Sequence, residues 1–100
     1  MIVSDNDFNE IVKSHRLIMI DFWAPWCGPC TKLGPILDEV SKETGIWLGK
    51  INIDDNISKP EEYHVTSIPT VILFEDGVPV KRIIGAKPKH IIMNEISEWI

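Results

Sequence analysis

The sequence predicts an α/β domain with a mixed central β-sheet and helices on both faces of that sheet. Helical and strand periodicities alternate through the first half of the chain, as is typical of parallel βαβ units. Asp76–Gly77 then predicts a hairpin, which would add antiparallel strands to the same sheet. The length of 100 residues, 44% of them hydrophobic, supports a single domain over residues 1–100.

The first quarter of the chain predicts a strand, a helix and a second strand. A short strand is expected at Ile2–Val3. Ser4 and Asp7 then form a capping-box signal for a helix over about 5–14. The apolar run over 17–22 is typical of a central strand that is buried on both faces.

The middle of the chain predicts a long helix, a strand and a short helix. Apolar residues recur at helical spacing over 28–44, and Gly45 ends that pattern. Residues 47–53 alternate well enough to form a second buried strand. Ser58, followed by a proline and a glutamate, predicts a short helix that ends near His64.

The last third predicts a hairpin and a final helix. The apolar run over 70–74 predicts a strand, and the turn at Asp76–Gly77 leads into another over 78–84. Because Pro79 has no N–H to donate to a neighbour, this last strand is expected at the edge of the sheet. Pro88 opens the final helix. Its inward face is expected to consist of Ile92, Ile96 and Trp99.

The composition argues against several classes of partner. Ten basic against 15 acidic residues give a formal net charge of -5, which is unsuited to nucleic-acid phosphates or an anionic membrane. No apolar run is long enough to cross a bilayer, and no secretory signal is visible. We therefore expect a cytoplasmic protein that binds neither nucleic acid nor membrane. In that reducing compartment a disulfide is more often catalytic than structural.

The only two cysteines stand three residues apart, in Cys27-Gly28-Pro29-Cys30. This spacing lets a disulfide close and reopen with little movement of the backbone. A structural thiol pair or half of a zinc site is the alternative, but zinc needs four ligands and only three distant histidines are available. The motif therefore predicts reversible redox chemistry with no metal and no bound cofactor.

The two cysteines are expected to play different roles. Unpaired amides and the helix dipole at the helix start would stabilise the thiolate of Cys27, which makes it the expected nucleophile. Cys30, one turn further and expected to be more buried, would resolve a mixed disulfide. Pro29 fits the first helical turn, and the Gly28–Pro29 insert carries no histidine, which favours a reductant over an oxidant.

The segment from Asp21 to Cys30, Asp-Phe-Trp-Ala-Pro-Trp-Cys-Gly-Pro-Cys, resembles the active-site segment of the thioredoxin family. The resemblance covers nearly the whole chain and implies the thioredoxin fold. It also implies a protein-disulfide reductase that is a monomer, receives electrons from an NADPH- or ferredoxin-linked thioredoxin reductase, and passes them to client proteins. The other matching segments are 35–37, 50–54, 68–70, 74–77 and 85–86.

The resemblance also implies roles for further residues. Pro69 is the expected cis-proline beside the disulfide, the alternative being an ordinary trans turn. Asp21 resembles the buried family acid, with Lys50 as its neighbour, and would accept the Cys30 proton through water. A solvent-exposed Asp21 at a strand end is the alternative. A groove for extended substrates is expected from Trp26, Ile53, Ile68, Pro69, Ile84, Gly85 and Ala86.

Three positions depart from the family pattern, and two other functions remain open. Thr31 and the pair Thr66–Ser67 stand where many members carry a cation, which puts the contact with the reductase in question. A dithiol oxidase or isomerase of the same fold would differ in reduction potential. A module that holds client proteins without turnover is the alternative from a different class.

Overall fold

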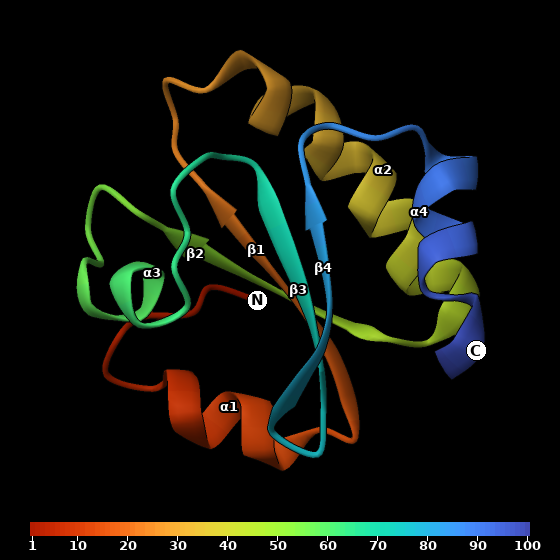
Figure 1. Cartoon of the computed structure of the whole chain (residues 1–100), viewed down its shortest axis with the longest axis horizontal. Helices are drawn as coiled ribbons and strands as arrows, with labels where there is room; N and C mark the ends of the chain where they lie inside the picture. The colour runs from red at the N-terminus through yellow and green to blue at the C-terminus, as the bar shows by residue number, and fades with distance from the viewer.

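Four strands form one mixed sheet in the order β2-β1-β3-β4 in the computed structural model, which describes residues 1–100 (Figure 1). Strands β1 (Leu17–Trp23) and β2 (Trp47–Asn52) are parallel. Strand β3 (Thr70–Glu75) is antiparallel to both β1 and β4 (Val78–Ile84). The predicted combination of a parallel βαβ unit with an antiparallel hairpin is confirmed.

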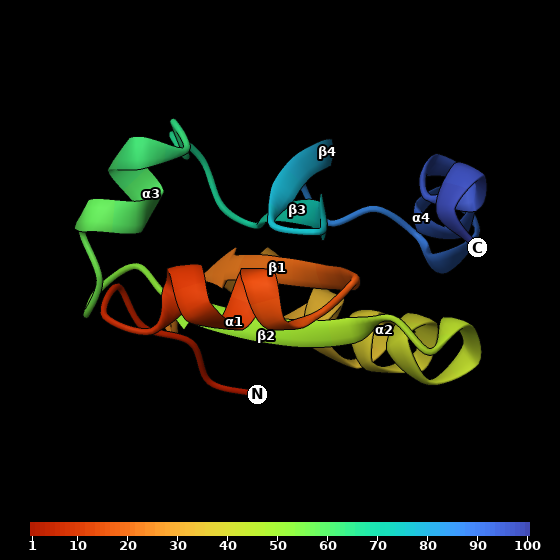
Figure 2. The same ribbon diagram turned by 90° about the horizontal axis from the view of Figure 1, so that it is seen from below.

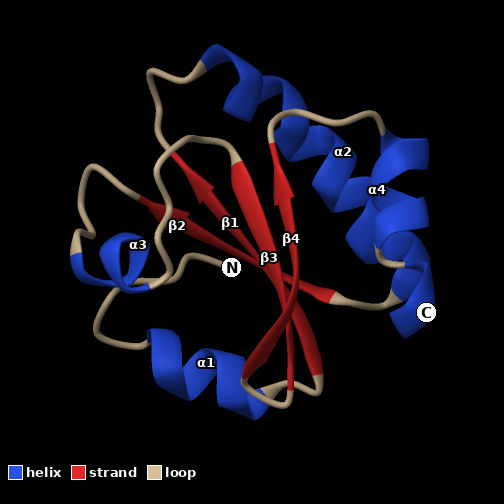
Figure 3. Cartoon of the chain, in the orientation of Figure 1, coloured by secondary structure: helices blue, strands red, loops and turns tan.

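Helices cover both faces of the sheet (Figures 1 and 3). Helix α2 (Gly28–Thr44) and helix α4 (Lys89–Glu95) cover one face, whereas α1 (Phe8–Ser14) and α3 (Ser58–Glu62) lie toward the other. The predicted final helix is shorter than expected, because it gives way to a 3-10 turn at Ser97–Trp99. No helix has both the length and the apolar character needed to span a membrane.

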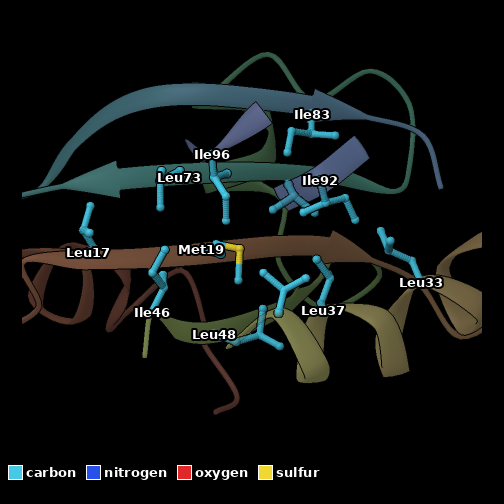
Figure 4. Close-up of a cluster of buried hydrophobic side chains, with 12 residues drawn as sticks. Leu17, Met19, Leu33, Leu37, Ile46, Leu48, Leu73, Ile83, Ile92 and Ile96 are labelled. Carbon is cyan, nitrogen blue, oxygen red and sulfur yellow. The ribbon is translucent and has the colours of Figure 1, made fainter. Parts of the chain in front are cut away.

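Strand β1 divides the hydrophobic core into two clusters. Leu17 and Met19 point into a cluster of 12 buried residues beneath α2 and α4, which Figure 4 shows. Their neighbours Ile18 and Ile20 point into a cluster of nine buried residues on the α1 side. Burial on both faces confirms the prediction of a central strand and gives the cysteine motif, which follows β1, a rigid support.

The hairpin and the edge strand also match the sequence. Asp76 and Gly77 have φ angles of 51° and 84°, the positive values that a two-residue hairpin turn requires. Figure 2 shows the strands in succession, with β4 at one edge and the N-terminal segment beyond β2 at the other. Pro79 therefore lies on an edge strand, and the β3–β4 register shifts beside it, between Leu73 and Phe74.

The N-terminal segment differs from the prediction. Ile2–Val3 does not form a strand of its own, because it makes only an isolated bridge to Lys50. The helix predicted over 5–14 begins later, at the first residue of α1. The carboxylate of Asp7 accepts hydrogen bonds from the amide and the hydroxyl of Ser4, at 2.7 and 3.1 Å, and the bond from the amide is the one that a capping box predicts. Residues 5–7 nevertheless form a turn.

Helix α3 takes its N-terminal cap from a distant part of the chain. The carboxylate of Asp5 accepts hydrogen bonds from the amides of Ser58 and Lys59, at 3.0 and 2.8 Å. Ser58 starts the helix as predicted but makes no capping hydrogen bond with its side chain. The helix ends at Glu62 rather than near His64, whose φ of 54° is incompatible with a right-handed helix.

Candidate active site

Cys27 and Cys30 form a disulfide where the loop after β1 meets the start of α2, with their Cα atoms 5.3 Å apart. Cys27 is the N-cap residue of α2, and its Sγ accepts a hydrogen bond from the amide of Cys30 at 3.2 Å. The exposed residues Gly28 and Pro29 form the first positions of the helix, where the missing N–H of proline costs nothing. The Cys27 sulfur therefore lies at the positive end of the helix dipole.

The predicted difference in burial between the two cysteines is wrong for this disulfide form. Cys27 is 5% exposed and Cys30 is 4% exposed, because the bond holds both in one small cluster with Ala24. The two differ instead in their surroundings. Cys27 Sγ lies 3.9 Å from the carbonyl oxygen of Ile68, whereas Cys30 lines the cavity that leads to Asp21.

The loop before β3 lies beside the disulfide. The Ile68–Pro69 peptide bond is cis, as the family resemblance implies. The carbonyl of Pro69 accepts a hydrogen bond from the amide of Gly85 at 2.8 Å. Gly85 has a φ of 91°, which residues with a side chain rarely adopt. The two loops that precede β3 and follow β4 are thus joined next to Cys27.

The predicted groove residues fall into two groups. Trp26 and Ile68 line a cavity of about 310 Å³, together with Ile53, Val65, Thr66 and Ser67. Trp26 is 68% exposed, and its indole Nε1 donates a hydrogen bond to Asp54 at 3.0 Å. Ile84 and Ala86 are also exposed, but they do not line this cavity and belong to the segment around Gly85.

Asp21 is buried, which excludes the alternative of a solvent-exposed strand end. It is 2% exposed, and its Oδ1 has no hydrogen-bond partner. Asp21 pairs in register with Lys50 of β2. Burial raises the pKa of Asp21 from 3.8 to about 6, whereas the positive charge of Lys50 lowers this pKa and the negative charge of Asp38 raises it.

A cavity of about 240 Å³ connects Asp21 with Cys30. Its wall also includes Trp23, Thr31, Gly34, Pro35, Asp38 and Lys50. The arrangement therefore places a disulfide that can be broken and re-formed next to a carboxyl group whose pKa lies near neutrality. Such a carboxyl group can take up or release a proton as the disulfide is made or broken.

Sequence reasoning missed two acidic residues of the site. Asp54 binds the indole of Trp26, and Asp38 lines the cavity beside Asp21. Asp38 was open to detection, since it stands eight residues after Cys30 and therefore on the same face of a helix. No group of three or more His, Cys, Asp and Glu side chains is arranged to hold a metal ion.

Comparisons with known proteins agree on one family. The family model described as Thioredoxin matches residues 1–98. The chain is 42% identical over 101 residues to thioredoxin from Mycobacterium tuberculosis, which covers 98% of this chain and 87% of that protein. It is 41% identical over 95 residues to the bifunctional thioredoxin reductase/thioredoxin of Mycobacterium leprae, covering 93% of this chain and 21% of that protein. The solved structure of Plasmodium falciparum thioredoxin matches with a TM-score of 0.90 at 31% identity, covering 99% of this chain and 98% of that one.

Proposed function

The chain belongs to the thioredoxin family, and we propose that its Cys27–Cys30 pair reduces disulfide bonds in other proteins. It is a protein-disulfide oxidoreductase. The observation that carries the proposal is the disulfide at the start of α2, connected through one cavity to the buried carboxyl group of Asp21, whose Oδ1 has no hydrogen-bond partner. Residues 1–100 are proposed to act as one thioredoxin domain and as a monomer, since a single chain supplies all of these groups.

In the first step the reduced protein attacks a client disulfide through Cys27. Its thiolate, stabilised by the start of α2, bonds to one client sulfur, and the client S–S bond breaks. The departing client sulfur leaves as a thiolate and takes a proton from water. The product is a mixed disulfide between Cys27 and the client.

In the second step Cys30 resolves this mixed disulfide. Asp21 accepts the thiol proton of Cys30 across the cavity, and the resulting thiolate attacks Cys27 Sγ. The bond between Cys27 and the client breaks, so the client leaves with its second sulfur reduced. Two electrons have then passed to the client, and the protein holds the Cys27–Cys30 disulfide seen in the structure.

Client recognition is proposed to use the surface around Cys27. An extended client segment would contact Trp26 and Ile68 on one side of the sulfur, and Ile84, Gly85 and Ala86 on the other. The exposure of Trp26 and Ile84, 68% and 53%, supports this, because large apolar side chains at the rim of a reactive group offer contact area to a partner. Pro69 is proposed to fix the course of the chain beside Cys27 through its cis peptide bond with Ile68, and Lys50 acts on the charge of Asp21.

A thioredoxin reductase is the proposed electron donor. The Mycobacterium leprae relative carries both activities in its name, which supports a functional pairing of the two proteins. An NADPH-linked or a ferredoxin-linked enzyme would deliver the same two electrons. Thr31, Thr66 and Ser67 present no charge at this surface, so the reductase is expected to bind by apolar contact and hydrogen bonds rather than by ion pairs. The cytoplasm is the proposed compartment, since catalytic rather than structural disulfides are the rule there.

Trapping of the mixed disulfide tests this function. The reduced Cys30→Ser variant, mixed with insulin as the client, should accumulate a covalent adduct that mass spectrometry detects and a thiol reagent releases. The matched variant Cys27→Ser should form no adduct through the same surface and should not reduce insulin. Normal turnover by Cys30→Ser would reverse the assigned order of attack. Binding of the client without any adduct or turnover would support the non-catalytic module instead.

A further inference from the structure

The cavity beside Asp21 contains a charged residue to which the two steps above give no role. Asp21 comes from β1, Lys50 from β2, and Cys30, Gly34 and Asp38 from α2, and all five line the same space of about 240 Å³. The cavity therefore holds two carboxyl groups and one ammonium group. Of these three charged groups, only those of Asp21 and Lys50 have a part in the two reaction steps.

The three α2 residues share one face of the helix. Cys30, Gly34 and Asp38 are spaced by four residues, so each lies one turn beyond the previous one on the side that faces the cavity. Cys30 is buried at the inner end, whereas Asp38 is exposed at the outer end. Asp38 thus lies at the solvent end of the cavity, and the reactive sulfur of Cys30 lies at its buried end.

The ammonium group of Lys50 lies against α2 rather than in an ion pair with Asp21. A Cβ atom added to Gly34 would be 3.4 Å from Lys50 Nζ, which places this ammonium beside α2. No carboxylate oxygen of Asp21 or Asp38 comes within 4.0 Å of Lys50 Nζ. Oδ1 of Asp21 also lacks any hydrogen-bond partner.

We propose that Asp38 is a positioning residue for the Asp21 proton, because it draws the Lys50 ammonium to the α2 side of the cavity and adds its own negative charge. Asp21 then remains able to receive the Cys30 proton near neutral pH. This inference rests on the proposed function for its role in turnover, but not for the arrangement of charges.

Both actions of Asp38 raise the pKa of Asp21. A negative charge near Asp21 disfavours a second negative charge there, and an ammonium held away from Asp21 stabilises its ionised form less. The charged groups that face Asp21 are Lys50 from β2 and Asp38 from α2, which are the two whose charges act on its pKa besides burial. Because Asp38 is exposed, added salt should screen its effect.

The first test follows the titration of Asp21 by NMR, through the chemical shift of its carboxyl carbon, in the disulfide form, where the cysteines do not titrate. Asp38→Asn should lower the pKa of Asp21 by roughly half a pH unit at low salt, and by less at high salt. Lys50→Met should raise it. The matched control is Glu39→Gln, which removes the same charge from the adjacent exposed position outside the cavity and should leave the pKa unchanged.

The second test separates the two actions of Asp38. In a Lys50→Met background, Asp38→Asn should lower the pKa of Asp21 by less than it does in the wild-type protein, because no ammonium remains to be drawn away. An equal effect in both backgrounds would overturn the positioning of Lys50. An unchanged pKa in Asp38→Asn, or the same decrease in Glu39→Gln, would overturn the proposal as a whole.

The kinetic consequence is a shift in a pH profile. Release of a client from the mixed disulfide, followed in a single turnover, should reach half its maximal rate at lower pH in Asp38→Asn than in the wild-type protein, by the same amount as the NMR titration. The NMR result needs no reductase activity, so failure of the proposed function would leave it intact. An NMR shift without the kinetic shift would overturn only the link between Asp38 and turnover.

Discussion

Replacing Asp21 by Asn should stabilise the protein, and by an amount that depends on pH. The folded protein binds the Asp21 proton with a pKa of about 6, because burial opposes ionisation, whereas the ordinary value for the unfolded chain is 3.8. Each tenfold difference in proton affinity corresponds to about 1.4 kcal/mol. Ionised Asp21 therefore costs the folded state about 3 kcal/mol, a cost that Asn does not carry.

The sign of the pH dependence follows from where the proton is bound. Below pH 3.8 the carboxyl group is protonated in both states, so it contributes no pH-dependent cost. Between 3.8 and about 6 the folded state binds more protons than the unfolded state, so stability falls as the pH rises. Above that range the full cost is present. The advantage of Asp21→Asn should thus grow by about 3 kcal/mol between pH 3.5 and pH 7.5.

Urea denaturation of the disulfide form at several pH values measures this advantage. The midpoints of Asp21→Asn and the wild-type protein should lie closest at pH 3.5 and separate as the pH rises. Asp55→Asn is the matched control, since Asp55 is an exposed aspartate and the substitution removes the same charge. A difference in urea midpoint between Asp21→Asn and the wild-type protein that stays constant across this pH range would refute the assignment of a buried carboxyl group with a raised pKa.

Three further outcomes are expected. Asp21→Asn should slow the single-turnover release of a client from its mixed disulfide more than it slows formation of that disulfide, and equal slowing of both steps would argue against a role in proton transfer. Gly49→Ala should lower the free energy of unfolding by about 1–3 kcal/mol, because the new Cβ would lie 2.7 Å from Cγ2 of Val3. Gly28→Ala is its control and should change this free energy by less than about 0.5 kcal/mol, because no atom lies within 4 Å of the new Cβ. Gly85→Ala should cost about 1–3 kcal/mol in the same denaturation experiment, because its φ of 91° is unfavourable for a side chain, and wild-type stability would show that the loop can adopt another conformation.

Most of the architecture follows from local sequence signals. The apolar stripe of α2 ends at Gly45, whose φ of 75° needs a glycine and whose amide closes the helix on Ser41. Asp76–Gly77 has the chemistry of the hairpin turn that it forms. In each case the residues that determine the structure stand within a few positions of it.

Two of the errors occurred where partners are far apart in the sequence. Ile2–Val3 depends on Lys50 for its only bridge, so its own residues do not decide whether it is a strand. The carboxylate of Asp5 accepts a hydrogen bond from the amide of Ser58 in α3, 53 positions away, and no local pattern indicates this contact. The start of α1 differs without a distant partner, because Asp7 bonds to Ser4 as a capping box predicts and residues 5–7 still form a turn ahead of Phe8.

The candidate site divides along the same line. The spacing of the two cysteines identified the redox pair, and resemblance to a family identified the cis-proline and the buried acid. The structure places Cys27 beside the Ile68–Pro69 segment and Cys30 in the cavity that contains Asp21. The equal burial of Cys27 and Cys30 depends on the disulfide between them, which a linear sequence does not express. The spacing of Asp38 from Cys30 places both on one face of α2, but that the same cavity also contains Asp21 depends on how α2 packs over β1 and β2.

The reduction potential of the Cys27–Cys30 pair tests the central claim most directly. Equilibration of the protein with glutathione buffers, followed by thiol labelling and mass spectrometry, measures it without any assumption about clients or reductases. A pair whose thiolate is stabilised by the start of α2, with no histidine between the cysteines, should be reducing, near the roughly -270 mV that is typical of thioredoxins. A potential near -120 mV, as in strongly oxidising members of the fold, would contradict the assignment as a reductase.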